Sequence, residues 1–437
     1  MKKNLSSSQV IILSFLSIIL TGTFLLMLPI SSKAGIVTPF KEALFTATSA
    51  SCVTGLVVQD TGTYWSLFGQ TIILILIQIG GMGVITISYL IFILFGKRMG
   101  LIERSYLSDS LSALSIGGIV RLTKFIVRMA LMIEITGALF LLPTFLKDFG
   151  GMGIWYALFH SISAFCNAGF DLLGIREHFS SLTTYATNAA ILLPIAALIV
   201  IGGIGFLTWE DLVKHKFHYH QYRLQSKVIL STTAILIGIP ALYFFIFEFQ
   251  NMGMKERILS SIFQSITPRT AGFNSIDYAS LSQSGQLLSI VLMLIGGASG
   301  STAGGIKVST FAILCFTTLA IIRRQEEINM FNRRITTDII LQCVAILTLY
   351  VFLMIGSTIL LASIEQIPAI RAGFECASAL GTVGLTLGIT PTLSSASHYL
   401  LIALMFIGRV GGLTFIFATT RNRKNKSKYP VEKITVG

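Results

Sequence analysis

Four short segments, each centred on a glycine, have residues suited to binding a bare cation. They span residues 49–56, 163–170, 266–273 and 378–385, and in each the glycine precedes a large apolar residue. A filter for a dehydrated cation needs oxygens that replace its hydration shell, and backbone carbonyls supply them where side chains stay clear. Glycine permits the unusual dihedral angles that such a loop demands. The pattern predicts four loops that surround one pore with rings of carbonyls.

Each predicted loop contributes a glycine and the three residues before it. The glycines are Gly55, Gly169, Gly272 and Gly384. The preceding residues are Cys52, Val53 and Thr54; Cys166, Asn167 and Ala168; Arg269, Thr270 and Ala271; and Gly381, Thr382 and Val383. Because the four sets differ in composition, we expect a filter less uniform than one made from identical subunits.

The composition places these loops in a membrane protein. Of 437 residues, 53% are hydrophobic and only 12% are charged, whereas soluble domains carry roughly 25% charged residues. The apolar runs are long and continuous, as helices in lipid require, and they lack the alternation of barrel strands. The sequence therefore predicts an all-α integral membrane protein.

The net charge of +13 does not indicate a nucleic-acid partner. Basic residues cluster at the ends of apolar runs, near residues 97–104, 214–227, 323–334 and 421–428. This distribution is typical of cytoplasmic loops. It predicts that both termini are cytoplasmic and that the protein contacts membrane lipid and binds no nucleic acid.

The elements around the glycine segments repeat four times within one pore domain. The expected repeats are residues 1–103, 104–221, 222–324 and 325–437, the last ending in a basic tail at 421–437. Each begins with a long apolar helix, expected at 10–30, 125–146, 228–249 and 339–362. Each continues with a helix too short to span a bilayer, expected at 39–48, 154–165, 258–267 and 368–380. A second long apolar segment completes eight spans and four re-entrant hairpins; it is expected as a helix at 67–95, 189–212 and 399–418, and at 286–322 as a stretch too long for one straight helix.

A second repeated pattern lies in these second helices. It occupies residues 79–86, 201–208, 295–302 and 407–414, each starting with Ile-Gly and ending with Thr. Its first glycine follows the loop glycine by 25, 33, 24 and 24 residues. A single copy is ordinarily explained by small residues at a helix interface. Two patterns in the same order four times favour a pore built from four repeats.

Two departures from the repeat predict a gate. The third copy and the residues that follow it contain Gly297, Ala298, Ser299, Gly300, Ser301, Thr302, Ala303, Gly304 and Gly305. So many small residues should break the helix, and irregular backbone at membrane depth is tolerated where it lines a cavity or is buried in protein. In the fourth copy Arg409 replaces a glycine, at a cost of at least ~2.5 kcal/mol on insertion scales. We hypothesise that Arg409, assisted by Lys307, bonds to this loop and holds a gate closed.

Three acidic residues have alternative interpretations. Asp60 and Asp171 follow two of the glycine segments, where they could concentrate cations at the outer mouth or cap loops. Glu134 lies inside the first helix of repeat two. For Glu134 the sequence favours a helix-packing contact over an ion ligand.

The repeats resemble the Trk/Ktr/HKT superfamily of potassium transporters over nearly the whole chain. The segments that carry the resemblance are residues 267–274, 300–307 and 406–409. With eight expected spans, the chain is most similar to the bacterial Ktr membrane subunit. The resemblance implies a bacterial cell-membrane protein that takes up potassium, often with sodium, and needs no organic cofactor. It also implies a homodimer with one pore per subunit and a cytosolic nucleotide-binding ring as regulatory partner.

In that superfamily the four filter glycines govern the preference for potassium, and a serine at the first marks sodium-conducting members. All four glycines are present here, which implies potassium sites at Gly55, Gly169, Gly272 and Gly384. Whether sodium is co-transported by symport or only regulatory stays open.

Two other function classes are less consistent with the sequence. An alternating-access transporter for another cation or small solute should show two broken helices in inverted halves, whereas this chain shows four like-oriented hairpins. The sequence has neither a metalloprotease His-Glu-x-x-His pattern nor a phosphate-binding loop, so we do not expect an enzyme.

Overall fold

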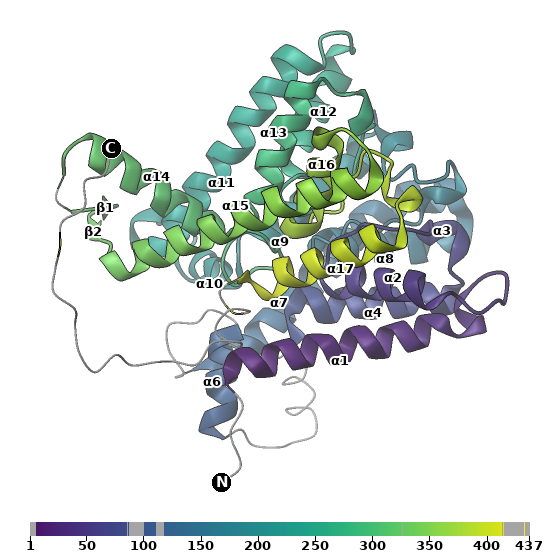
Figure 1. The fold of residues 1–437 in the computed structure, drawn as a ribbon, viewed down its shortest axis with the longest axis horizontal. Coiled ribbons are helices and arrows are strands. Elements are labelled where there is room, and N and C mark those ends of the chain that lie inside the picture. The colour runs from purple at the N-terminus through teal and green to yellow at the C-terminus, as the bar shows by residue number, and fades with distance from the viewer. Residues whose placement is uncertain are drawn as a thin grey trace.

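The computed structural model describes residues 6–84, 86, 100–110, 118–325, 327–412, 414 and 432. These residues are mostly helical (Figure 1). The strands β1 (Asn329–Met330) and β2 (Arg333–Arg334) form one small antiparallel hairpin. The basic tail, apart from residue 432, and the predicted helix beyond residue 86 lie outside the described residues. The prediction of an all-α membrane protein is confirmed.

A long apolar helix begins each repeat. These helices are α1 (Ser7–Met27), α7 (Ile119–Phe149), α11 (Leu224–Tyr243) and α15 (Thr337–Glu365), and the turn η6 (Phe244–Glu248) extends α11. All four are long and apolar enough to cross a membrane. Apolar side chains such as Phe352 stand exposed on the outer surface of α15, as contact with lipid requires.

A short helix follows in each repeat, as predicted. The four are α2 (Phe40–Ser51), α8 (Gly153–Phe165), α12 (Met254–Ile266) and α16 (Ala369–Gly381). At 12 or 13 residues, each rises only about 20 Å, less than the ~30 Å hydrocarbon core. Each therefore enters the protein without crossing the bilayer.

The second helices are shorter than predicted. They are α4 (Leu67–Met82), α9 (Ala189–Gly203), α13 (Gln283–Leu294) and α17 (Ser395–Val410). In repeat two the chain turns by 100° and continues as α10 (Phe206–His215). The prediction of one helix over 189–212 is therefore wrong. Gly205, at φ +90°, adopts a left-handed backbone that a helix cannot continue through. Gly83 and Gly411 end α4 and α17 in the same way, at φ +86° and +91°.

Repeat three breaks more completely, as predicted from its glycine-rich segment. Residues 295–307 leave the helix between α13 and α14 (Val308–Ile322). The two ends of the break pair through backbone hydrogen bonds from Gly296 N to Ile306 O (2.8 Å) and from Ile306 N to Leu294 O (3.1 Å). This pairing closes the segment into a compact loop, residues 296–305, called the glycine-rich loop below.

The repeats are arranged in a closed ring. The second helix of each repeat packs on the short helix of the next: α4 on α8, α9 on α12, α13 on α16, and α17 on α2. Figure 1 shows α17 beside α2, where the last repeat returns to the first. This cyclic contact pattern places the four short helices around a common centre.

Short elements connect these helices. They are η1 (Pro29–Ser31), α3 (Thr61–Tyr64), α6 (Leu101–Ser110), η2 (Gly150–Met152), η3 (Leu173–Ile175), η4 (Thr183–Tyr185), η5 (Tyr219–Gln221), η7 (Tyr278–Ser280) and η8 (Thr390–Thr392).

Candidate functional site

The four glycine loops share one backbone conformation despite their different side chains. They are residues 52–56, 166–170, 269–273 and 381–385, here called loops one to four. The residue two before each glycine has a left-handed φ: Val53 (+57°), Asn167 (+58°), Thr270 (+67°) and Thr382 (+51°). The glycines have φ between +68° and +97°. Non-glycine residues rarely adopt this region, so its recurrence in all four loops indicates one structural requirement met four times.

The loops meet around one centre. A methyl group placed on any of the four glycines would lie within 2.7 Å of the carbonyl oxygen that precedes the glycine of the next loop. The contacts are Gly55 to Ala168, Gly169 to Ala271, Gly272 to Val383, and Gly384 to Thr54. The order runs from loop one to loop four and closes on loop one. Only a residue without a side chain fits at these positions.

All four glycines line one outer cavity. Its volume is about 60 Å³, and its wall also contains Asp60, Asp171 and Thr386. This space corresponds to roughly two water molecules at ~30 Å³ each. The short helices end at the loops, so each brings the partial negative charge of its C-terminus toward the centre.

Asp60 and Asp171 both cap loops and line this cavity. Asp60 accepts hydrogen bonds from Thr63 N and Phe179 N, both at 2.9 Å. Asp171 accepts one from Leu173 N at 2.9 Å. Burial raises the pKa of the Asp171 carboxyl to about 7; the Leu173 bond opposes the rise and Asp60 adds to it. The two interpretations of these residues are therefore compatible.

A hydroxyl at the base of each loop anchors its backbone. Ser49 Oγ and Ser378 Oγ accept hydrogen bonds from Gly55 N and Gly384 N, at 3.1 and 3.0 Å. Ser163 Oγ donates to Phe170 O at 2.7 Å. In repeat three Thr267 donates to Phe273 O.

The anchor in repeat three corrects the alignment of the four segments. The sequence alignment placed Ile266 opposite the three serines, but the anchoring side chain is that of Thr267. Loop three thus has one residue fewer between its hydroxyl and its glycine. Superposing the four segments on their glycines without a gap hides this one-residue difference.

The first residues of the loops, unlike the later ones, cap or end the short helix in three of the repeats. Cys52 and Cys166 are helix caps with α-helical dihedral angles, and Gly381 ends α16. Arg269 is 7% exposed, and its guanidinium points toward α11, with Nη2 3.4 Å from Thr233 Oγ1. The side-chain amide of Asn167 and Oγ1 of Thr270 lie 3.3 Å apart, and their hydrogen bond connects loops two and three.

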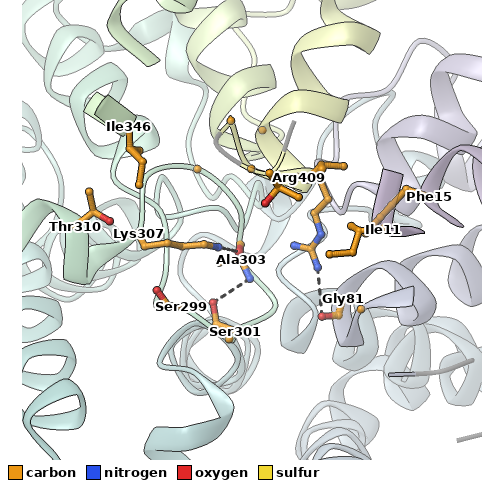
Figure 2. A pocket seen from close by; sticks show the side chains of 18 of the residues that line it. Ile11, Phe15, Gly81, Ser299, Ser301, Ala303, Lys307, Thr310, Ile346 and Arg409 are labelled. Atoms are coloured by element: carbon orange, nitrogen blue, oxygen red, sulfur yellow. Dashed lines mark hydrogen bonds between the residues drawn. The ribbon is translucent and has the colours of Figure 1, made fainter. Parts of the chain in front are cut away.

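A larger inner cavity of about 360 Å³ lies on the other side of the loops (Figure 2). On that side Gly304 of the glycine-rich loop packs against the side chain of Thr382 in loop four. The wall includes Gly81 of α4, half of the residues of the glycine-rich loop, Lys307 and Arg409. Ile11 and Phe15 of α1 close one side.

The glycine-rich loop is supported by the break in repeat two. Ala298 N donates to Gly203 O at 2.8 Å, and Phe206 N donates to Gly300 O at 2.7 Å. These bonds satisfy backbone groups that would otherwise be unpaired inside a membrane protein. The helix breaks of repeats two and three thus stabilise each other.

Arg409 connects two repeats across the inner cavity. Its guanidinium donates to Thr302 O of the glycine-rich loop, to Gly80 O, and to Gly81 O at 3.3 Å. Figure 2 shows it extending from α17 toward Gly81. The hydrogen bond to the loop was predicted, and the contact with the end of α4 was not. Lys307, at the start of α14, donates from Nζ to Ala303 O of the glycine-rich loop at 2.6 Å.

Glu134 takes part in helix packing. It is 3% exposed and accepts a hydrogen bond from Gln78 Nε2 of α4 at 2.9 Å. Cys166 Sγ in turn donates to Gln78 Oε1 at 3.6 Å. Glu134 therefore joins α7 to α4 behind loop two.

The second glycine pattern positions the second helices. A methyl group on Gly80, Gly202 or Gly408 would collide with the carbonyl oxygen of Ser51, Phe165 or Leu380, at the end of the short helix of the same repeat. A helix-interface role accounts for these three copies. In repeat three the corresponding Gly296 faces Gly304 O instead.

Sequence reasoning missed one set of residues behind the loops. Thr46, His160, Gln264 and Glu375 are at most 1% exposed, and each lies three residues before the anchoring hydroxyl. A polar residue recurring at this place in four largely buried helices is the signal that could have revealed them.

Comparison with known proteins identifies the family. A family model described as "TrkH: Cation transport protein" matches residues 4–428. The chain belongs to the TrkH family of cation transport proteins. The resemblance found in the sequence is thereby confirmed.

Several known proteins are similar to this chain over most of their length. The potassium/sodium uptake protein NtpJ of Enterococcus hirae is 39% identical, covering 100% of this chain and 98% of that protein. The Ktr system potassium uptake protein B of Bacillus subtilis is 38% identical, with coverages of 98% and 96%. The crystal structure of the potassium transporter TrkH from Vibrio parahaemolyticus matches with a TM-score of 0.75 at 19% identity, over 96% of this chain and 86% of that one. This last likeness shows the shared fold.

Proposed function

We propose that this protein takes up potassium ions across the cell membrane through the ring formed by loops one to four. The observation that carries the proposal is the closed cycle in which each glycine packs against a carbonyl of the next loop. Such a cycle brings backbone oxygens from four loops to one centre, the arrangement that a filter for a dehydrated cation needs. The names of the two full-length relatives, both potassium uptake proteins, support the choice of ion.

The same proposal assigns a gate to the glycine-rich loop and Arg409. The loop lines the inner cavity, and Arg409 ties it to the end of α4. A positive side chain beside a cation path opposes conduction. Opening then requires the loop to move away from Arg409, and Lys307 stabilises the loop in the closed arrangement.

Further parts of the proposal come from the family. We expect a homodimer in a bacterial cell membrane, with one pore in each subunit and a cytosolic nucleotide-binding ring as regulatory partner. Sodium is the candidate coupling or regulatory ion, in keeping with the name of the Enterococcus relative. The fourfold ring supports a pore over the alternating-access alternative, which would be built from two inverted halves.

The test is ion uptake into cells that lack their own potassium uptake systems. Gly55→Ser should reduce the preference for rubidium and potassium over sodium, because any side chain there displaces the carbonyl of Ala168. The matched control is Gly356→Ser in α15, where an added side chain meets no neighbour within 4 Å. Unchanged selectivity in Gly55→Ser, at a normal amount of protein in the membrane, would contradict the proposal.

A further inference from the structure

One buried polar side chain stands behind each glycine loop, at the same place in each short helix. The four residues are Thr46, His160, Gln264 and Glu375. Each lies three residues before the hydroxyl that anchors the base of its loop, so the same helical face presents both groups. A polar group in a buried position is costly unless it has a hydrogen-bond partner. The partners therefore indicate what these residues do.

In three repeats the partner is the third residue after the loop glycine. His160 Nε2 accepts a hydrogen bond from Leu172 N at 3.4 Å. Glu375 Oε1 accepts one from Leu387 N at 3.2 Å. In repeat three the contact is between side chains and the donor is reversed, with Gln264 Nε2 donating to Ser275 Oγ at 3.4 Å. The position is common to the three repeats, although the side chains are an imidazole, an amide and a carboxylate.

Glu375 makes the most extensive contact of the set. Besides Leu387 N, its carboxylate accepts hydrogen bonds from Thr386 Oγ1 and, at 2.7 Å, from Thr390 Oγ1. Thr386 lines the outer cavity beside Gly384. Bonds to a charged acceptor are stronger than neutral ones. The segment that leaves loop four is therefore the most firmly held of the four.

Repeat one lacks this contact. Thr46 has a short side chain, and within the described residues its Oγ1 has no hydrogen-bond partner. The third residue after Gly55 is Val58, whose side chain offers no polar group. Loop one is thus anchored at its base by Ser49, and its exit is held by another pair, with Gln59 Nε2 donating to Glu42 Oε2 of α2 at 2.9 Å.

We propose that His160, Gln264 and Glu375 are positioning residues that hold the exits of loops two to four and so set the cation preference of the ring, with Glu375 the most important. This inference rests on the proposed function. A loop fixed at both its base and its exit keeps its carbonyls at a set distance from the ion, and that distance distinguishes potassium from the smaller sodium ion. In loop one the exit is held by Gln59 and Glu42 instead, so Thr46 has no such role.

The test compares substitutions at one position in two repeats. Glu375→Leu removes three hydrogen bonds and should lower the selectivity, measured as the ratio of the sodium inhibition constant to the rubidium KM, by about tenfold. Glu375→Gln keeps an acceptor for Leu387 N and should restore the ratio to within about threefold of the wild type. The matched control, Thr46→Val, removes a hydroxyl without a described partner and should leave the ratio unchanged.

The outcomes separate this inference from the proposed function. If Glu375→Leu and Thr46→Val give the same ratio while Gly384→Ser lowers it, the positioning role is wrong and the filter assignment stands. If neither Gly384→Ser nor Gly55→Ser changes the ratio, the filter assignment itself fails. If Glu375→Leu does not accumulate in the membrane, Thr390→Val removes one of the three bonds and should lower the ratio about threefold; an unchanged ratio would then overturn the inference.

Discussion

The outer and inner cavities differ in construction and in charge. Four equivalent glycines line the outer one, with the carboxyl groups of Asp60 and Asp171 in its wall. The inner one is lined partly by the repeated Ile-Gly pattern and partly by its departures, the glycine-rich loop, Lys307 and Arg409. The groups repeated around the ring thus present oxygens, and the departures from the repeat present positive charges.

Under the proposed function, this difference would allow four similar repeats both to select an ion and to control its passage. Selection by carbonyl oxygens requires an approximately symmetric ring, so every repeat must keep the same loop conformation. A gate needs only one movable element. One repeat can therefore replace part of its second helix with the glycine-rich loop, and another can carry an arginine in place of a glycine. The predictions below test this division, beginning with the largest expected effect.

The largest effect is expected where the second helices pack against the bases of the loops. Gly202→Ala places a methyl group against the Phe165 carbonyl oxygen, whereas Gly203→Ala meets only Asn167, at 3.5 Å. Overpacking of this kind typically costs about 1–3 kcal/mol, and more against rigid backbone. We expect Gly202→Ala to abolish the monodisperse peak in detergent size-exclusion chromatography and Gly203→Ala to keep it. If the two variants give the same chromatographic peak, the contact between α9 and the end of α8 tolerates an added methyl group.

A smaller effect is expected at the inner cavity. Arg409→Ala removes the bonds from α17 to the glycine-rich loop and to α4, so the rubidium flux should rise several-fold while selectivity stays constant. Lys307→Met removes one bond within the loop and should raise the flux less. Flux is measured in proteoliposomes at a matched amount of protein. Unchanged or lower flux from folded Arg409→Ala would contradict the gating role.

The smallest effect is expected at the outer mouth, from Asp171. Because burial raises the pKa of this carboxyl to about 7, it is charged above that pH and becomes neutral as the pH falls. The rubidium KM of the wild type should therefore rise about twofold to threefold between external pH 8 and 6. Asp171→Asn should remove this dependence.

The control for that experiment is Asp277→Asn. Asp277 accepts a backbone hydrogen bond from Ala279 N at 2.9 Å, as Asp171 does from Leu173 N, but it does not line the outer cavity. It should keep the pH dependence of the wild type. A dependence that persists in Asp171→Asn would show that another group is responsible.

Much of the fold followed from patterns that membranes impose on a sequence. The long apolar helices, the short helices and the break in repeat three were all predictable, because lipid requires continuous apolar helices and glycine weakens them. The end of α9 at Gly203 was not predictable in the same way. A glycine inside an apolar run is compatible with a continuous helix, and the left-handed angle at Gly205 arises where Phe206 N bonds to Gly300 O of another repeat.

The sequence by itself determined that there are four repeats, where each loop glycine lies, and that Arg409 and the glycine-rich loop depart from the pattern. Only the tertiary structure decided that each glycine meets a carbonyl of the next loop, that Thr267 takes the place of the serines, and that Arg409 also contacts α4. The physical reason is that periodicity and composition report how each segment meets lipid or water. The partner of a carbonyl, a hydroxyl or a guanidinium depends instead on distances between repeats, which no single segment encodes.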